Sequence, residues 1–265
     1  MIFGSGRKKW VGRTILLLVH LGFGRGKIKS IFSKMWLKFV GCEPVELEYH
    51  GIKLRLIPAG NNIESKILFG SRLREEKELQ HIKAKIVNGV FFDIGANIGY
   101  YSLMAAKYGA SRTVAFEPNP ELAKRCRLNV ELNQFSDRIE LVEAALGERN
   151  GTVNLKLDDV DLGSSSIVSD VRGAREIVVP IVTLREVVTK MDVTRIDVLK
   201  IDVEGMEDRI LKPFFLTAQK SILPKMVIIE DSSKSDWNWD ILDWMLLNDY
   251  TVESHSRGNL ILARQ

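Results

Sequence analysis

The sequence predicts an α/β protein with a Rossmann-like, doubly wound sheet, and three observations support this class. Apolar runs of strand length alternate with segments of helical periodicity from Val90 onward. A glycine-containing turn joins the first of these strands to the first helix, as in βαβ units. The last two apolar runs flank a short polar turn, which predicts an antiparallel hairpin at one edge of the sheet. The 265 residues suffice for one large α/β domain with additions.

Residues 1–44 are predicted to form a basic N-terminal extension. Nine Lys or Arg and no acidic residue lie in residues 1–42, whereas the rest of the chain carries more acidic than basic residues. From Ile28 to Phe39, apolar and aromatic residues recur at helical spacing with lysines between them, which is typical of an amphipathic helix on a membrane surface. The apolar stretch from Thr14 to Phe23 is ten residues long, too short for a membrane span of about 20. We expect the extension to contact an anionic membrane surface. The alternative is that it packs on the protein's own domain or on a second subunit.

Residues 45–88 are predicted to lead from this extension into the main domain, which we place at 89–265. Val45–Ile57 alternates around His50-Gly51 and predicts a hairpin. Residues 63–87 have helical periodicity and predict one or two helices, which Asn88-Gly89 ends.

Strands and helices are expected to alternate within the main domain. The expected strands cover residues 90–94, 113–117, 139–146, 152–157, 177–184, 196–202, 226–230, 250–254 and 259–263. The expected helices cover residues 98–108, 120–133, 206–212 and 238–248. Pro213 should stop the third of these helices. A polar loop at 158–166 interrupts the alternation, and a loop of this length in a compact domain is usually functional or mobile.

The turn after the first core strand restricts the ligand that it can bind. A dinucleotide site would need glycine at positions 97 and 100, where this chain has Asn97 and Tyr100. Asp93 stands two residues before the turn, where a carboxylate repels phosphate but attracts an ammonium group. Glu117 ends the next strand, at the position of a ribose-binding acid. A nucleoside with a zwitterionic tail and no phosphates, such as S-adenosylmethionine, fits these features. The alternative is that Asp93 and the glycines only shape a structural turn.

Acidic residues follow several of the predicted strands, at the edge of the sheet where ligands bind in this fold. They are Asp93, Glu117, Glu143, Asp202, Glu204, Glu230 and Asp231. Lys200 lies two residues before Asp202 on the same face of its strand, and a lysine inside a core strand needs a partner. A structural ion pair and a catalytic role both satisfy that need. Cys126 is expected in the core, and neither the two cysteines nor the four scattered histidines have the spacing of a disulfide framework or a metal site.

Four segments resemble the FkbM-type S-adenosylmethionine-dependent methyltransferases. They are Asp93–Ser102, Phe116–Pro120, Ala145–Gly147 and Leu199–Gly205, in the order that the family has them. The most specific is Asp202-Val203-Glu204-Gly205, and the resemblance spans residues 85–232 without reaching 1–60. It implies a Rossmann-like methyltransferase fold, usually with O-methylation of a sugar, glycolipid or polyketide-type natural product.

The resemblance also implies roles by position. The turn should hold the amino-acid end of S-adenosylmethionine, Glu117 the ribose, and Glu143 with Ala144 the adenine. The turn residues concerned are Asp93, Gly95, Asn97 and Gly99.

A carboxylate at a strand end is expected to remove the proton of the acceptor hydroxyl. Asp202 is the first choice, because it borders the methyl group and the acceptor, and Glu204 and Glu230 follow. Asp202 with Glu230 or Asp231 would also suit Mg²⁺, but no spacing in the chain requires a metal.

Two other functions stay open at this stage: an NAD(P)-dependent oxidoreductase, which Asn97 and Tyr100 oppose, and a non-catalytic nucleoside-binding or interaction module. We expect no nucleic-acid partner, because Asp-Val-Glu-Gly replaces the Pro-Pro-aromatic motif of base-methylating enzymes and the main domain is acidic. The expected location is the cytoplasm, with the inner face of the membrane as a candidate site. The sequence specifies neither the acceptor nor the oligomeric state.

Overall fold

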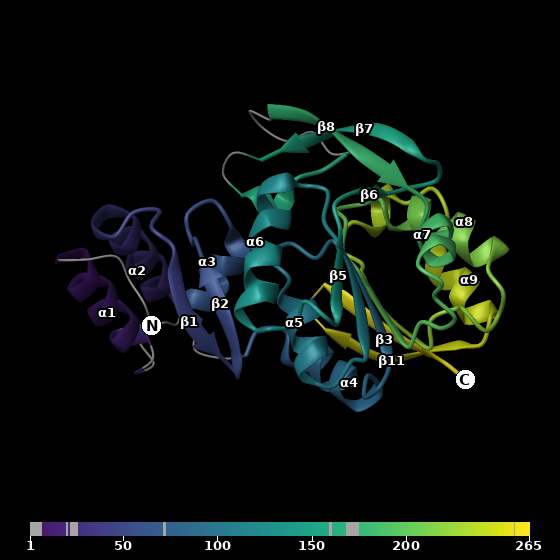
Figure 1. Cartoon of the computed structure of the whole chain (residues 1–265), viewed down its shortest axis with the longest axis horizontal. Coiled ribbons are helices and arrows are strands. Elements are labelled where there is room, and N and C mark those ends of the chain that lie inside the picture. Colours follow the sequence, from purple (N-terminus) through teal and green to yellow (C-terminus); the bar gives the residue numbers. More distant parts are fainter. Residues whose placement is uncertain are drawn as a thin grey trace. The chain divides into compact units, whose positions relative to one another are not determined.

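The computed structural model describes residues 7–19, 21, 26–70, 73–158, 161–167, 175–256 and 258–265, and the chain divides into two compact units (Figure 1). Unit 1 comprises residues 1–76 with 159–163, and unit 2 comprises residues 77–158 and 164–265. The helices are α1 (Arg7–Leu18), α2 (Gly26–Phe39), α3 (Asn62–Leu68), α4 (Glu76–Lys85), α5 (Tyr100–Lys107), α6 (Pro120–Leu132), α7 (Leu184–Lys190), α8 (Glu207–Thr217) and α9 (Ile241–Leu247). The strands are β1 (Val45–Tyr49), β2 (Ile52–Leu56), β3 (Val90–Ile94), β4 (Arg112–Phe116), β5 (Ile139–Val142), β6 (Ala145–Leu146), β7 (Gly151–Leu157), β8 (Arg175–Val182), β9 (Val198–Ile201), β10 (Met226–Glu230), β11 (Tyr250–Ser256) and β12 (Asn259–Arg264).

Unit 1 contains the helix pair α1–α2, the β1–β2 hairpin and α3. The hairpin turns at His50-Gly51, as predicted, and both residues have positive φ. Asn61 caps α3 by accepting hydrogen bonds from the backbone N–H groups of Ile63 and Glu64. The Asp161 carboxylate accepts a further bond from the Asn62 backbone N–H at 3.0 Å. A segment from the middle of the chain is therefore part of this unit.

The apolar side of α2 divides into two stripes. Phe32 and Trp36 are buried, and Trp36 packs edge-on against Phe69 with ring centroids 5.7 Å apart. Ile31, Met35 and Phe39 remain exposed along the neighbouring stripe; the side chain of Ile28 lies outside the described residues. Part of the predicted amphipathic face thus packs within the protein, and part stays on the surface. Among the described residues, no helix has the length and apolarity needed to cross a bilayer.

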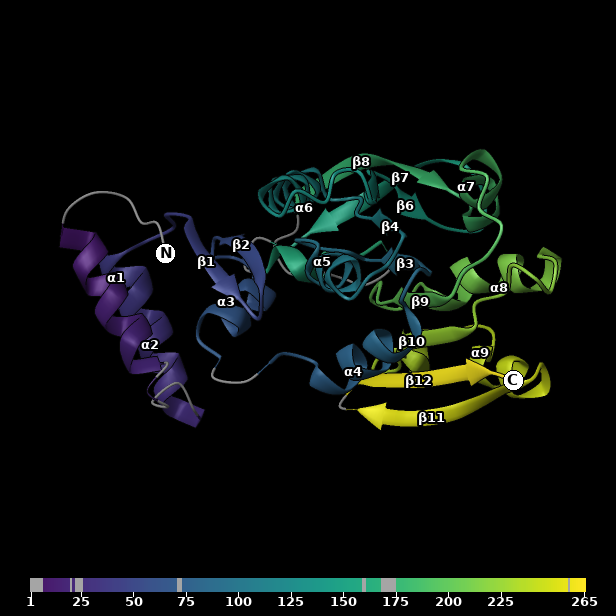
Figure 2. The same cartoon turned by 60° about the horizontal axis from the view of Figure 1, so that its bottom comes forward.

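Unit 2 is built on a seven-stranded sheet in the order β11-β12-β10-β9-β3-β4-β5 (Figure 2). Strands β5, β4, β3, β9 and β10 are parallel, whereas β12 and β11 form an antiparallel hairpin at the edge. The predicted fold class is confirmed, including the C-terminal hairpin. The strand order reverses between β3 and β9, and this reversal is where α/β sheets bind their ligands.

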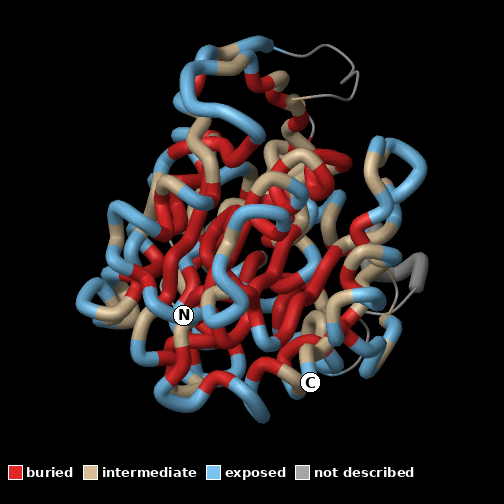
Figure 3. The backbone as a smooth tube through the Cα atoms, turned by 90° about the vertical axis from the view of Figure 1, so that its right-hand side faces the viewer, coloured by how far each residue is buried: buried red, intermediate tan, exposed pale blue. Residues whose placement is uncertain are grey.

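The two faces of the sheet differ in chemistry because side chains alternate along each strand. One face is apolar: Phe92 and Ile94 of β3 belong to a core cluster with residues of α7, α8 and α9. The opposite face, which α5 covers, holds the register pair Asp93 and Lys200. Figure 3 shows the buried strands in the centre of the molecule. Polar chemistry is therefore confined to one side of the central strands.

Two predicted elements differ from the structure by more than their end residues, and helix α7, which begins where the strand predicted at 177–184 ends, was not predicted. Residues 139–146 are two strands in different sheets, because β5 joins the main sheet and β6 joins a three-stranded sheet with β8 and β7. The helix expected to stop at Pro213 continues to Thr217. Proline removes one backbone hydrogen bond from this helix, but Phe214 and Phe215 beyond it are buried. Phe215 also stacks on Trp244 with centroids 4.7 Å apart, so packing offsets the lost bond.

Gly99, which caps α5, should tolerate replacement poorly, for two separable reasons. Its φ is +84°, and an added Cβ would lie 2.7 Å from the Cys126 sulfur. We expect Gly99→Ala to lower the free energy of unfolding by about 2–5 kcal/mol, from backbone strain and overpacking together. In a Cys126→Ala background the nearest atom is Cβ at 3.7 Å, so the cost should fall to the backbone strain of about 1–2 kcal/mol.

Chemical denaturation of the four proteins in this cycle measures both costs. Gly258→Ala is the matched control, because Gly258 has φ +93° with nothing within 4 Å of its added Cβ. Equal costs at Gly99 and Gly258 would contradict close packing of α5 on α6.

Candidate functional site

The β3–α5 turn is anchored by a buried carboxylate. Asp93 is fully buried, and its Oδ2 accepts hydrogen bonds from the Ser102 backbone N–H at 3.0 Å and hydroxyl at 2.6 Å. Burial raises the pKa of Asp93, and the nearby Lys200 ammonium opposes that rise. The first turn of α5 thus fixes the acid that the sequence singles out.

Gly95 lies where two backbone turns meet. Its φ is +79°, and a Cβ at this position would stand 2.0 Å from the Asp202 carbonyl oxygen. Asn97 also has positive φ, at +54°, and its side-chain Oδ1 accepts a bond from the Ile98 N–H at 2.9 Å. Asparagine tolerates this conformation better than most residues, so the turn needs no third glycine at position 97.

Glu117 connects the β3–α5 turn to the end of β4. Its Oε2 accepts from the Asn97 backbone N–H at 2.8 Å, and its Oε1 accepts from the Asn119 N–H at 2.9 Å. Burial raises the pKa of Glu117 to about 7, despite these two stabilising bonds. The predicted ribose-binding acid is therefore preorganised by the backbone on both of its sides.

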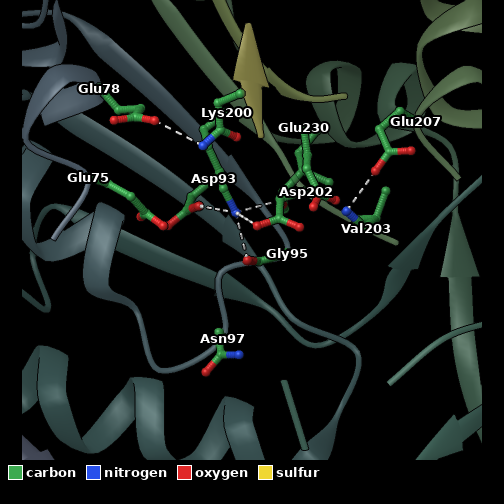
Figure 4. Close-up of polar contacts among 12 residues, drawn as sticks. Glu75, Glu78, Asp93, Gly95, Asn97, Lys200, Asp202, Val203, Glu207 and Glu230 are labelled. Carbon is green, nitrogen blue, oxygen red and sulfur yellow. Dashed lines mark hydrogen bonds and ion pairs between the residues drawn. The ribbon is translucent and has the colours of Figure 1, made fainter. Parts of the chain in front are cut away.

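The end of β9 brings Lys200 and Asp202 to the same turn (Figure 4). The Lys200 ammonium lies 3.5 Å from Asp202 Oδ2 and 3.9 Å from Asp93 Oδ1, and it donates to the Gly95 carbonyl at 3.1 Å. Lys200 is buried, whereas the Asp202 side chain is 37% exposed. Lys200 thus has the partner that a buried lysine needs, and two carboxylates, Asp93 and Asp202, share that role.

Glu207 holds the Asp202–Gly205 turn in place, and the sequence analysis missed it. Its Oε1 accepts from the Val203 N–H and its Oε2 from the Trp237 indole N–H, each at 2.9 Å. Glu204, which has φ +55°, occupies the corner of this turn. An acid in the first turn of α8 is the signal that could have identified Glu207. Burial raises its pKa.

Glu230 ends β10 next to Asp202. Ile229 pairs with Ile201 in the parallel ladder, so the next residues, Glu230 and Asp202, end neighbouring strands on one face. Burial and the Asp202 carboxylate raise the pKa of Glu230 to about 8. Asp231 instead lies 3.2 Å from His255. Within the described part of the chain, no cluster of three or more metal-binding side chains occurs.

A pocket of about 50 Å³ adjoins the two turns. Gly95, Val203 and Ala144 line it, together with Leu155 and Ile167 from the region of the small sheet. Ala144 therefore lies in the same pocket as residues of the two turns. Glu143 is exposed and forms an ion pair with Arg127, so its side chain is not brought into this group.

A sequence model described as "Methyltransferase FkbM domain" matches residues 93–254, more than half of the chain. The chain belongs to the FkbM methyltransferase family. The resemblance noted in the sequence is thereby confirmed, and with it membership of an S-adenosylmethionine-dependent methyltransferase family.

Other known proteins are similar to this chain. A tRNA1(Val) (adenine(37)-N6)-methyltransferase of Shewanella loihica is 43% identical over 54 residues, 20% of this chain and 22% of that protein. A solved FkbM methyltransferase of Methylobacillus flagellatus KT is 15% identical with a TM-score of 0.46, over 97% of this chain and 59% of that one. TrmK of M. capricolum, solved with S-adenosyl-homocysteine, is 14% identical with a TM-score of 0.41, over 70% of this chain and 66% of that one. The chain thus spans under a quarter of the curated relative's length and 59% of the Methylobacillus chain.

Glu117 should make the stability of the FkbM domain depend on pH. Its pKa rises from 4.5 to about 7 on folding, so its contribution to stability is present below pH 4.5 and is lost as the pH rises through 7. In Glu117→Ala this pH-dependent loss of stability is absent, because the titrating carboxyl is gone. We expect the destabilisation caused by this substitution to be smaller at pH 8 than at pH 5, by about 2–3 kcal/mol.

Denaturant titrations of both proteins at the two pH values measure this difference. Asp137→Ala, at a carboxylate that is 76% exposed, controls for the loss of an acidic side chain. A Glu117→Ala cost that is the same at both pH values would show that folding does not shift the pKa of Glu117.

Proposed function

We propose that this FkbM methyltransferase methylates a hydroxyl group of a sugar, glycolipid or polyketide-type natural product. The observation that carries the proposal is the row of carboxylates at the ends of β9 and β10, next to the glycine turn of β3. A hydroxyl is a poor nucleophile until its proton is removed, so its methylation calls for an aligned base.

The cofactor-binding roles are proposed for residues whose geometry fits S-adenosylmethionine. Gly95 lines the pocket, which continues from it to Ala144. Glu117 lies between the Phe116 and Pro118 that line this pocket, and its carboxylate suits the two hydroxyls of a ribose. Bound there, the cofactor would supply an electrophilic methyl group. The proposal keeps Asp93, Asn97 and Gly99 as parts of the turn at its amino-acid end.

Asp202 is our first choice for the general base, followed by Glu230 and Glu204. Asp202 is partly exposed and stands against the Gly95 turn, where an acceptor can reach it. Glu230 is half-buried with a pKa of about 8, a value that suits proton transfer near neutral pH. The roles of the two acids are separable by substitution.

The partial similarity to a tRNA methyltransferase raises the alternative of a nucleic-acid acceptor. We retain a small molecule, glycan or glycolipid, because the acidic balance of the chain after residue 42 opposes binding to a phosphate backbone. The Asp202-Val203-Glu204-Gly205 turn supports the same choice. RNA therefore serves as a competing acceptor in the test.

Asp202→Ala should keep cofactor binding and lose methyl transfer. S-adenosylhomocysteine should raise the Tm of the parent protein and of the variant alike. Transfer of labelled methyl from S-adenosylmethionine to cellular glycan and lipid extracts should fall about 10²–10⁴-fold in the variant.

Asp137→Ala is the matched control and should keep both properties. Absence of a Tm shift in the parent protein would overturn the cofactor assignment, and full turnover by Asp202→Ala would exclude Asp202 as the base. Label found in RNA but not in glycans or lipids would overturn the acceptor class. If glycans or lipids carry the label, mass spectrometry of cells without the gene should identify the substrate as a species that lacks one methyl group.

We also propose that the α1–α2 pair docks on an anionic membrane surface, at the inner face of the membrane. Exposed apolar side chains here are Trp10 (75%) and Leu17 (61%) of α1 and Leu21 (66%) between the helices, in a region with nine basic residues and no acid. Exposed aromatic and aliphatic groups beside cations are what an interfacial helix needs.

Charge reversal on this pair should release the full chain from vesicles. Arg13, Lys34 and Lys38 are exposed, so the triple change to Glu should abolish co-sedimentation with phosphatidylserine-containing vesicles without unfolding the protein. Lys124→Glu with Lys190→Glu and Lys220→Glu makes the same charge change at exposed sites of unit 2 and should leave binding intact. Equal loss in both triple variants, or a change of oligomeric state confined to the first, would contradict a specific membrane face.

A further inference from the structure

We propose that Lys200 is a positioning residue for methyl transfer, which ties the β3–α5 turn to the Asp202 carboxylate. The proposal rests on the proposed function, because Asp202 is there a candidate base. Lys200 is buried in the central strand β9, where lysine is rare without a partner.

Two groups compensate the buried charge of Asp93: the Lys200 ammonium opposes the rise in its pKa most strongly, and Ser102 does so through two hydrogen bonds. The two bonds from Ser102 reach Asp93 Oδ2 at 3.0 and 2.6 Å, whereas the ammonium is 3.9 Å from Oδ1. Asp93 Oδ1 accepts no hydrogen bond within the described residues. The ammonium thus lies closer to the Asp202 carboxylate than to Asp93, the buried acid opposite it in the sheet.

The closer contacts of Lys200 are with the site. Its Nζ donates to the Gly95 carbonyl at 3.1 Å and lies 3.5 Å from Asp202 Oδ2 (Figure 4). It also stands 5.4 Å from the centroid of the Tyr101 ring, which further restricts the ammonium. A purely structural lysine would need only Asp93; this one joins two turns that belong to different strands.

The consequence for catalysis is geometric. Gly95 belongs to the turn proposed to hold the cofactor, and Asp202 to the turn proposed to face the acceptor. A single ammonium fixes the distance between them, because it contacts the Gly95 carbonyl on one side and the Asp202 carboxylate on the other. Alignment of acceptor and methyl group tolerates only small displacements, so loss of this contact should slow transfer more than it weakens cofactor binding.

The test compares Lys200→Met with Lys200→Arg in the full chain. Lys200→Met keeps an unbranched side chain without the charge, and we expect kcat per folded molecule to fall about 10²-fold. The Kd for S-adenosylhomocysteine and the KM for S-adenosylmethionine should change by less than about tenfold. Lys200→Arg keeps a cation and should retain more of kcat than Lys200→Met.

A second pair of variants covers the case in which Lys200→Met does not fold. Asp93→Asn removes the acid that an absent lysine would leave uncompensated, so Asp93→Asn with Lys200→Met should be folded. Its kcat should lie about 10²-fold below that of Asp93→Asn alone. A lower Tm with unchanged kcat in either background would overturn the positioning role. Absence of methyl transfer by the parent protein would instead refute the proposed function, so the two failures are distinguishable.

Discussion

The site depends on the close approach of two backbone turns. The Asp202 carbonyl oxygen stands where any side chain at position 95 would place its first carbon, so glycine is required there. That approach brings the end of β9 beside the start of α5, at the reversal of strand order. Glu117 then fixes the same turn from the β4 side through the Asn97 N–H. The ends of β3, β4 and β9 are thus held together in two ways. The close approach of the turns at Gly95 leaves no space for a side chain, and the Glu117 carboxylate accepts a hydrogen bond from the turn.

The division of the sheet into an apolar and a polar face explains how buried charges are tolerated so near the core. Phe92 and Ile94 point into the cluster beneath α7 to α9, while Asp93 between them faces α5. Because side chains alternate between the two faces of the sheet, the charged residues do not interrupt the packing of the apolar core. The remaining cost is desolvation, which appears as raised pKa values of Asp93 and Glu117. Such tuned acids are characteristic of sites that bind or react.

Much of this arrangement could be predicted from the residues, because strand length, periodicity and turn chemistry are local properties. The βαβ unit, the strand-end acids and the edge hairpin have local signals. The continuation of α8 through Pro213 has none, since burial of Phe214 and Phe215 is decided by tertiary packing. Glu207 has a local signal, its place in the first turn of α8, but its hydrogen bonds with Val203 and Trp237 arise only when the chain folds. Periodicity also identified α2 as amphipathic but could not tell which of its apolar residues pack internally.

The loop between β7 and β8 has a consequence for how the chain can be divided. The sequence leaves unit 2 after Asp158, supplies residues 159–163 to unit 1, and returns at Ser164. Within unit 1, Asp161 binds the start of α3 and the Leu162 N–H donates to the Gly60 carbonyl. Cutting the chain near residue 76 would leave those partners on separate molecules. The two units are therefore not modules in series, and a shuffled or truncated gene could not inherit one of them whole.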